Sequence, residues 1–397
     1  MKMRWGSASR LVGRALPLAA VAGAVVLAAG YLAIPGNAAD PPAVTPESLG
    51  NDLFFDVNLS KNRAQACASC HSPNLAFTDP RANAKGAGAV SVGDDGKSIG
   101  ERNAPTATYA SFAPEFHINA KGKAVGGLFL DGRAKTLEEQ AGGPPLNPVE
   151  MGMPDKASVV ARLKENPSYV AAFNTLYGAG VLDDVEKGFA AMTSAIAAFE
   201  RTPQFAPFDS KYDRYLRGEE KLTDQEELGR VLFFSTQFTN CSQCHKLNVM
   251  GGSEKEVFSN FEYHNVGTPA NAALHAANGK PADRGLSANP AIKSTAEEGK
   301  FKVPTLRNVA VTGPYMHNGV FNDLRTVVLF YDKYNSKARK RQINPETGKP
   351  WDPPEVPQNL SMKELETGPG LDDRRVDALV AFLKTLTDKR YEPLIPQ

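Results

Sequence analysis

Apolar residues recur at helical spacing along much of this chain, whereas the alternation of apolar and polar residues that marks a strand is scarce. Near the C-terminus one apolar stripe follows the acidic pair Asp372-Asp373 and consists of Val376, Leu379, Val380, Leu383 and Leu386. Acidic residues in front of such a stripe are typical of a helix start. A second apolar helix is predicted through residues 189–200, and prolines between residues 203 and 207 end it. The pattern predicts a mainly α-helical fold.

Two segments lack helical periodicity and are predicted to be loops. Residues 78–100 are rich in Gly, Ala and Asp, and residues 344–357 contain five prolines, which favours a surface excursion. Just before the second segment stand four cations, Lys337, Arg339, Lys340 and Arg341. Such a cluster is more often a solvated face than a docking site.

The N-terminus has the pattern of an export signal. Residues 1–39 include four cations and no acid, with an uncharged apolar run at residues 15–34 and small residues at Ala38 and Ala39. We expect residues 1–39 to be a cleaved signal peptide, although the apolar run is also long enough to span a bilayer as an anchor. Export to the periplasm is the predicted localisation, with no stable membrane association once the leader is cleaved.

Charge narrows the classes of partner. The full chain carries 45 basic and 44 acidic residues, and without the four leader cations the balance becomes 41 to 44, or −3. A nearly neutral chain gives no indication of nucleic-acid binding.

All four cysteines lie in two copies of one pentapeptide motif, Cys67-Ala68-Ser69-Cys70-His71 and Cys241-Ser242-Gln243-Cys244-His245. Cys-x-x-Cys-His is the attachment signature of a c-type haem, in which the thiols bind the porphyrin and the histidine ligates iron. A zinc site would need the two pairs much closer together in the chain than Cys70 and Cys241 are, and a disulfide would leave both histidines unexplained. The motifs predict two covalent haem c groups.

A weak internal repeat connects the two motifs. Leu53-Phe54-Phe55 precedes the first motif as Leu232-Phe233-Phe234 precedes the second, and Asp131-Gly132 matches Asn318-Gly319 at an offset of 187 that also relates Leu137 to Leu324. We therefore expect two cytochrome c-like haem domains related by internal duplication. Their predicted bounds are 40–205 for the N-terminal domain and 206–397 for the C-terminal domain.

The opposite axial position decides whether a haem is reactive, because an electron carrier closes it with Met or His. Between His71 and Glu150 the sequence has one other histidine, His117, and no methionine. This composition favours an open first haem. A partly buried carboxylate such as Glu150 could move the proton that peroxide cleavage requires.

The segment from Leu128 to Gly152, which includes Asp131-Gly132-Arg133, Gln140 and Asn147-Pro148-Val149-Glu150, resembles bacterial di-haem cytochrome c peroxidases and their MauG-type relatives. The resemblance extends over nearly the whole exported chain. It implies that Glu150 is the acid–base group at the peroxide site and that Gln140 lies beside it. It also implies a calcium site between the haems on Asn103, Thr312 and the carbonyl of Pro314, which are hard oxygen donors of the kind calcium prefers.

Tyr331 marks one departure from the ordinary peroxidases. The resemblance places the methionine that closes the second haem downstream of His317, at the position where this chain has Tyr331, as MauG-type enzymes do. The offset of 187 maps Tyr331 onto Pro144, between Gln140 and Glu150, so both positions should face the distal side of their own haem. We expect Tyr331 to ligate the second iron, with Met316 as the alternative.

Tryptophan is missing where the family uses it. Leu130 stands at the position between the haems, and Thr239 and Asn240 stand before the second motif, where MauG-type enzymes use tryptophan to oxidise a protein substrate. Leucine cannot carry an oxidising equivalent. Tyr109, Phe129 or Tyr315 are the candidate substitutes.

The resemblance implies a periplasmic peroxidase that reduces hydrogen peroxide at the N-terminal haem. Electrons would enter through the C-terminal haem from a small cytochrome c or a cupredoxin. The alternatives are a MauG-like haem oxidase that modifies a partner protein and a non-catalytic di-haem electron carrier.

Overall fold

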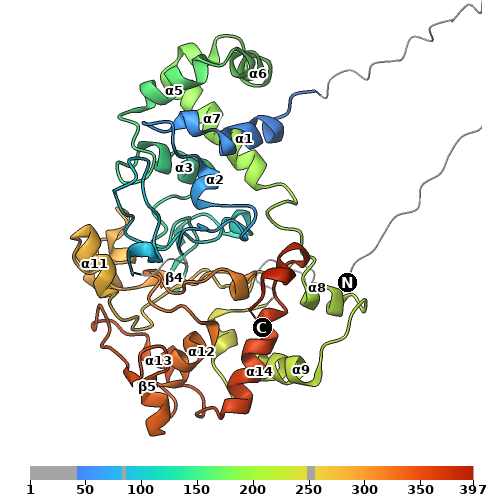
Figure 1. Cartoon of the computed structure of the whole chain (residues 1–397), viewed down its shortest axis with the longest axis vertical. Coiled ribbons are helices and arrows are strands. Elements are labelled where there is room, and N and C mark those ends of the chain that lie inside the picture. Colours follow the sequence, from blue (N-terminus) through green and yellow to red (C-terminus); the bar gives the residue numbers. More distant parts are fainter. Residues whose placement is uncertain (1–42, 83–85, 248–254, 397) are drawn as a thin grey trace, which may run out of the picture. The chain divides into compact units, whose positions relative to one another are not determined.

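The structure is a computed structural model that describes residues 43–82, 86–247 and 255–396, and residues from Val44 onward form one compact unit. Helices of the first half are α1 (Pro46–Phe55), α2 (Cys67–Cys70), α3 (Leu137–Ala141), α4 (Gly143–Leu146), α5 (Lys156–Lys164), α6 (Pro167–Tyr177) and α7 (Val185–Glu200). Those of the second half are α8 (Lys211–Leu216), α9 (Asp224–Phe234), α10 (Cys241–Cys244), α11 (Ala272–Asn278), α12 (Leu324–Asp332), α13 (Met362–Leu365) and α14 (Asp373–Lys384). The mainly helical prediction is confirmed (Figure 1).

The described strands are short and form three separate antiparallel pairs. They are β1 (His117–Ile118) with β2 (Ala124–Val125), β3 (Tyr263–His264) with β4 (Phe301–Lys302), and β5 (Ile343–Asn344) with β6 (Lys349–Pro350). These pairs fasten loops rather than form a sheet core.

Capping side chains set where the longer helices begin. The Thr45 hydroxyl accepts a hydrogen bond from the backbone of Ser48 at the start of α1, and Thr223 accepts one from Glu226 at the start of α9. Asp372 caps α14 in the same way, and its predicted apolar stripe is buried or half-buried. α7 ends at Glu200, where the sequence predicted its end.

A close helix crossing builds the core of each half. α1 crosses α7 at Gly50, where a Cβ atom would lie 1.9 Å from the carbonyl oxygen of Ala195. α9 crosses α14 at Gly229, where a Cβ atom would lie 1.9 Å from the carbonyl oxygen of Ala378. Both crossings are visible in Figure 1, α1 with α7 near the top and α9 with α14 near the bottom. Glycine is required at each because no other residue leaves room for the opposing backbone.

Backbone features also recur at the offset of 187. The isolated bridge between Leu128 and Ala134 corresponds to the one between Tyr315 and Phe321. Phe129 and Met316 have positive φ angles of 60° and 70°, and Gly132 and Gly319 follow with 69° and 62°. The same offset relates the first residues of α3 and α12, Leu137 and Leu324.

The proline-rich excursion is held in place by specific contacts. Trp351 donates a hydrogen bond to the carbonyl of Arg341 at 2.8 Å and packs edge-on against Phe321 and Phe330. The Glu355 carboxylate is 4% exposed and lies 3.1 Å from ring nitrogens of both His275 and His317. Where it is described, the predicted 78–100 loop contains turns, bends, a short 3₁₀ segment and an isolated bridge between Val92 and Ile99. Its residues 83–85 lie outside the described part.

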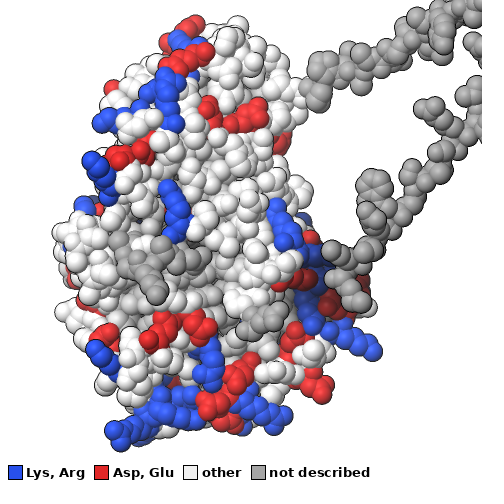
Figure 2. Space-filling model, viewed as in Figure 1, with Lys and Arg blue, Asp and Glu red and all other residues white. Residues whose placement is uncertain are grey.

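Charges of both signs are mixed on the surface. Lys337, Arg339 and Lys340 are exposed as predicted, whereas Arg341 is buried and forms ion pairs with Asp332 and Asp373. Figure 2 shows a broad uncharged area across the middle of this face, with acidic and basic side chains interspersed above and below it. Among the described residues, none of the helices is both long and apolar enough to cross a membrane. The predicted leader lies outside the described residues.

Candidate functional site

Each Cys-x-x-Cys-His motif forms one helical turn with its histidine immediately after it. His71 Nδ1 lies 3.0 Å from the carbonyl oxygen of Phe77, and His245 Nδ1 lies 2.8 Å from that of Phe258. A carbonyl only accepts, so Nδ1 carries the proton and Nε2 keeps its lone pair for a metal. Phe77 and Phe258 have φ angles of 52° and 54°, so the two turns share the same local geometry.

Burial shifts the pKa values of the histidines and cysteines in both motifs. It lowers the pKa of His71 and takes the pKa of His245 to about 4, so both rings are neutral at pH 7. All four cysteines are free thiols, and burial raises the pKa of Cys67 and Cys244 to about 12. The disulfide alternative therefore has no support in the structure, and all four thiols are available to hold porphyrins.

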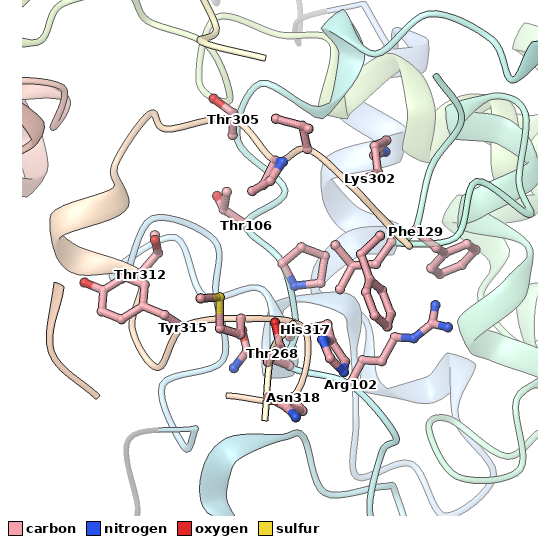
Figure 3. A pocket seen from close by; sticks show the side chains of 18 of the residues that line it. Arg102, Thr106, Phe129, Thr268, Lys302, Thr305, Thr312, Tyr315, His317 and Asn318 are labelled. Atoms are coloured by element: carbon pink, nitrogen blue, oxygen red, sulfur yellow. The ribbon is translucent and has the colours of Figure 1, made fainter. Parts of the chain in front are cut away.

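One cavity of about 1070 Å³ takes in both motifs. Its wall carries the cysteines and histidines of both motifs, as well as Gln140, Pro144 and Glu150 from the first half and Tyr331 from the second. Residues of both halves line the part of the cavity that Figure 3 shows, with Arg102 and Phe129 from the first half and Thr312, Tyr315 and His317 from the second. Two neutral histidines with free Nε2 atoms on one large, mostly apolar cavity fit a pair of haems.

The predicted peroxide site is assembled from α3, α4 and the following turn. Gln140 lies on α3, and Glu150 ends the turn that leaves α4. Asn147 Nδ2 donates to Glu150 Oε1 at 2.8 Å and thereby fixes the direction of the carboxyl group. Burial raises the pKa of Glu150, while Arg133 and Asn147 oppose the shift. A carboxyl group with a raised pKa holds its proton more readily than a free carboxyl group, which suits it to give and take a proton at a reacting oxygen.

Two further side chains that could in principle bind the first iron, His117 and Met151, lie elsewhere or belong to the core. His117 is on β1, exposed, with its Nδ1 against the carbonyl of Glu115. Met151 borders the cavity but is part of the apolar cluster of α1, α5 and α7.

Tyr331 and Met316 both border the cavity, so the structure keeps both as candidates for the second iron. Burial raises the pKa of the Tyr331 phenol, and the neighbouring Cys244 and Cys241 thiols add to the rise. Tyr331 and both cysteines line the same cavity. Met316 has a positive φ angle of 70° in the loop that precedes α12.

The three residues of the predicted calcium site also border the cavity. Asn103 donates to the carbonyl of Ala89 at 2.8 Å through its side-chain nitrogen, which leaves its amide oxygen available. Thr312 and Pro314 lie on the same wall, in the loop that follows the 3₁₀ turn Val309–Val311. The described residues contain no cluster of three or more His, Cys, Asp or Glu side chains suited to a metal ion, so calcium stays a prediction that rests on neutral oxygen donors.

Two ionisable groups on the wall, one buried and one half-buried, were not found from the sequence. Glu200 is the last residue of α7, and burial raises its pKa to about 8. Lys302 on β4 donates to the carbonyl of Gly127, and burial lowers its pKa to about 8. The only signal for Glu200 was its position one turn beyond Ile196 on the apolar face of a helix.

The tryptophan departures are visible in the structure. Leu130 borders the cavity, whereas Trp351, the one tryptophan within the described ranges, packs on Phe321 and Phe330 in the excursion. Thr239 is buried and donates to the carbonyl of Leu232, and Asn240 donates to the carbonyl of Glu364. Neither replaces the aromatic ring that stands there in MauG-type enzymes.

Comparisons with known proteins identify relatives of this chain. The family model described as di-haem cytochrome c peroxidase matches residues 45–221. The methylamine utilization protein MauG of Paracoccus denitrificans is 57% identical over 88% of this chain and 90% of its own length, and the cytochrome c551 peroxidase of Nitrosomonas europaea is 31% identical over 94% and 92%. The crystal structure of the diheme peroxidase BthA from Burkholderia thailandensis has a TM-score of 0.79 and 34% identity, covering 90% of this chain and 89% of that one.

Proposed function

Because this chain belongs to the di-haem cytochrome c peroxidase family, which includes MauG oxidoreductases, it is a c-type haem enzyme, and we propose its particular role. It is a periplasmic peroxidase that reduces hydrogen peroxide at the His71 haem, with electrons arriving through the His245 haem. The observation that carries the proposal is the Glu150 carboxyl, which has a raised pKa and lies with Gln140 on the cavity wall that also holds His71. A small cytochrome c or cupredoxin is the proposed donor.

Each residue of the proposed peroxide site has a separate role. When bound, each haem supplies an iron that takes up or passes on electrons. Cys67 and Cys70 would hold the first porphyrin, and His71 would offer its Nε2 atom to the iron, because Nδ1 is committed to the Phe77 carbonyl. Glu150 then takes a proton from the near oxygen of peroxide and returns it to the far oxygen, so that water leaves. Gln140 orients the peroxide by a hydrogen bond.

The second half would repeat the attachment with Cys241, Cys244 and His245, and we propose that Tyr331 would offer its phenol oxygen to that iron. The helix α12 brings the phenol to the cavity, and the thiols of the second motif already influence its pKa. A tyrosinate ligand donates charge and lowers the reduction potential relative to methionine.

Calcium between the haems, bound by Asn103, Thr312 and the carbonyl of Pro314, belongs to the same proposal. Elemental analysis of the purified protein checks it, and a calcium content far below one ion per chain contradicts it.

Internal duplication is the proposed origin of the two haem domains, 40–205 and 206–397. Its support is the paired glycine crossings at Gly50 and Gly229 and the backbone features that recur at an offset of 187.

Substitution of Glu150 tests the function directly. We expect Glu150→Gln to lower peroxide turnover by about 10²–10⁴-fold, the usual contribution of one positioned acid–base group, with both haems still bound. Glu138→Gln is the matched control, since Glu138 on α3 pairs with Arg201 at the surface and should leave turnover unchanged. Normal turnover in Glu150→Gln removes this residue from the mechanism.

Low-temperature electron paramagnetic resonance of the oxidised protein tests the open site. A high-spin signal from one haem is expected, and two low-spin signals would favour the non-catalytic carrier instead. Tyr331→Met should raise the reduction potential of the second haem. Tyr334→Phe is the control and should leave this potential unchanged, because the Tyr334 hydroxyl donates to the carbonyl of Val266. An unchanged potential in Tyr331→Met means that Tyr331 is not a ligand.

A second candidate is a MauG-like oxidase that modifies a partner protein. The 57% identity to the Paracoccus denitrificans protein and the tyrosine at position 331 favour it. Leu130, Thr239 and Asn240 oppose it, because none of them can relay an oxidising equivalent to a partner. Peroxide turnover with a small cytochrome c as donor supports the peroxidase, and slow turnover with covalent oxidation of a partner supports the oxidase.

A further inference from the structure

A buried tyrosine and a buried aspartate meet beside the haem cavity. Tyr109 is 2% exposed and borders the cavity together with both cysteine motifs. Its hydroxyl lies 2.5 Å from Asp388 Oδ1, although the two residues are 279 positions apart in the sequence. Asp388 is fully buried and directly precedes the 3₁₀ segment Lys389–Leu394 near the C-terminus.

The surrounding hydrogen bonds fix which way the phenol donates. The backbone N–H of Phe208 donates to the Tyr109 hydroxyl oxygen at 3.2 Å, so the phenolic proton is left for Asp388. The other carboxylate oxygen of Asp388 accepts from Asn308 Nδ2 at 2.8 Å, and the Asp388 backbone N–H donates to Asn308 Oδ1 at 2.8 Å. The carboxylate is therefore held in one position with one oxygen aimed at the phenol.

The charge nearby decides which oxidation product is possible. The Arg307 guanidinium lies 5.3 Å from the centre of the Tyr109 ring. Removing an electron alone would place a phenol cation beside this buried cation, which is unfavourable at low dielectric. If the proton leaves with the electron, the product is a neutral tyrosyl radical, and Arg307 does not oppose it. A proton acceptor within hydrogen-bond distance is thus what makes this ring oxidisable.

Comparison with the other cavity tyrosines singles out Tyr109. Three described tyrosines border the cavity, and of these Tyr315 donates to the carbonyl of Val309 and Tyr331 is the proposed iron ligand. A backbone carbonyl cannot keep a proton, whereas a carboxylate can. Among the three, Tyr109 alone combines a place on the wall with a base at its hydroxyl.

We propose that Tyr109 is an oxidisable residue of the haem pair, which gives an electron to a haem and its phenolic proton to Asp388. This inference rests on the proposed peroxidase function, because hydrogen peroxide is the oxidant. Its reduction to water takes two electrons from the haem pair, and Tyr109 replaces one of them as its O–H bond breaks. The electron donor later restores the electron, and Asp388 returns the proton. Tyr109 thereby supplies an oxidisable aromatic ring in a chain that has Leu130 between the haems.

The ionisation of Asp388 gives the proposal a pH dependence. Burial raises the pKa of Asp388 to about 6, and Asp209 adds to the rise, whereas its hydrogen bonds from Tyr109 and Asn308 and the Arg307 charge oppose it. Tyr391 and Asp213 are the other ionisable groups that face this pair. The carboxylate is available above about pH 6 and is protonated below it. Between pH 7 and pH 5 its ionised fraction falls about tenfold.

The test uses the haem-loaded protein with ring-deuterated tyrosine, mixed with hydrogen peroxide and frozen for electron paramagnetic resonance. A radical signal narrowed by the deuterium label is expected in the unmodified chain. It should be absent in Tyr109→Phe, at least tenfold weaker in Asp388→Asn, and unchanged in Tyr315→Phe, the matched control. The radical yield, normalised to the change in haem absorption of the same sample, should fall about tenfold from pH 7 to pH 5.

The outcomes separate this inference from the function on which it rests. If peroxide changes the haem absorption and no tyrosyl radical appears, or if Tyr109→Phe keeps the same radical, the inference is wrong while the peroxidase stands. If the haem absorption does not respond to peroxide at all, both fall. Should Tyr109→Phe fail to fold, Asp388→Asn decides, because asparagine keeps the shape of the side chain and cannot take the proton. A full radical yield in that variant, or one without pH dependence in the unmodified chain, overturns the proposal.

Discussion

The ion pair between Arg307 and Asp213 should be the most costly in this protein to break from one side. Arg307 Nη1 and Nη2 lie 2.5 and 2.9 Å from the two carboxylate oxygens of Asp213, and the side chains are 0% and 3% exposed. In Asp213→Asn the amide can keep part of this geometry, but the buried guanidinium loses its counter-charge. Breaking a buried pair in this way costs about 3–5 kcal/mol in free energy of unfolding.

The chain contains a matched control with the same geometry at the surface. Arg63 Nη1 and Nη2 lie 2.8 and 3.0 Å from the carboxylate oxygens of Glu165, and these side chains are 48% and 46% exposed. Water screens such a pair, so Glu165→Gln should cost only about 0–1 kcal/mol. The two variants differ in burial and share the bidentate contact, which isolates the effect of the low-dielectric interior.

Urea titration of the haem-loaded protein at pH 7, followed by far-ultraviolet circular dichroism, measures both changes. The midpoint should fall far more in Asp213→Asn than in Glu165→Gln. Added salt should diminish only the smaller effect, because buried pairs are screened little. Equal midpoint shifts in the two variants, or a shift in Asp213→Asn that salt abolishes, would refute the reasoning from burial.

Two further predictions concern the helix crossings and Glu200. Gly50→Ala and Gly229→Ala should each destabilise the protein by about 1–3 kcal/mol or more, because a Cβ atom would lie 1.9 Å from an opposing carbonyl oxygen, and thermal unfolding that matches the unmodified protein would contradict this. Glu200 releases its proton near pH 4.5 when unfolded and near pH 8 when folded, so the folded state binds the extra proton between these values. Stability from this group is therefore present at pH 4.5 and is lost as the pH rises to 8. Glu200→Gln should remove that decline, and urea midpoints at pH 5 and pH 8.5 that fall equally in both proteins would exclude it.

Features written locally in the chain could be predicted from the sequence. The Cys-x-x-Cys-His pentapeptides predicted the two cysteine-containing turns. The apolar periodicity predicted α7 with its last residue at Glu200, and α14 with its start after Asp372. The offset of 187 also carried structural information, because bridges and positive φ angles recur at that spacing. Each of these depends on residues within a few turns of one another or on a sequence pattern that recurs along the chain.

Contacts between distant segments could not be predicted. Arg307 meets Asp213 across 94 positions and Tyr109 meets Asp388 across 279, and no local pattern marks either pair. The excursion at residues 344–357 looked like a free surface loop because of its prolines. Its Glu355 is nonetheless buried, since His275 and His317 come from other segments to meet it.

The two Cys-x-x-Cys-His turns hold their histidines in the same geometry. A chemical difference between the two haems must therefore come from side chains on the opposite wall of the cavity. α3 and α12 begin at equivalent positions, Leu137 and Leu324, but α12 continues as a regular helix through Tyr331. In the first half Gly142 ends α3 after little more than one turn, and Pro144 stands at the position equivalent to Tyr331. Proline has no side-chain donor atom and cannot continue a helix from within it. We therefore attribute the proposed difference between an open first iron and a closed second iron to this helix, which is interrupted in the first half and unbroken in the second. The interruption also turns the chain so that Glu150 reaches the cavity.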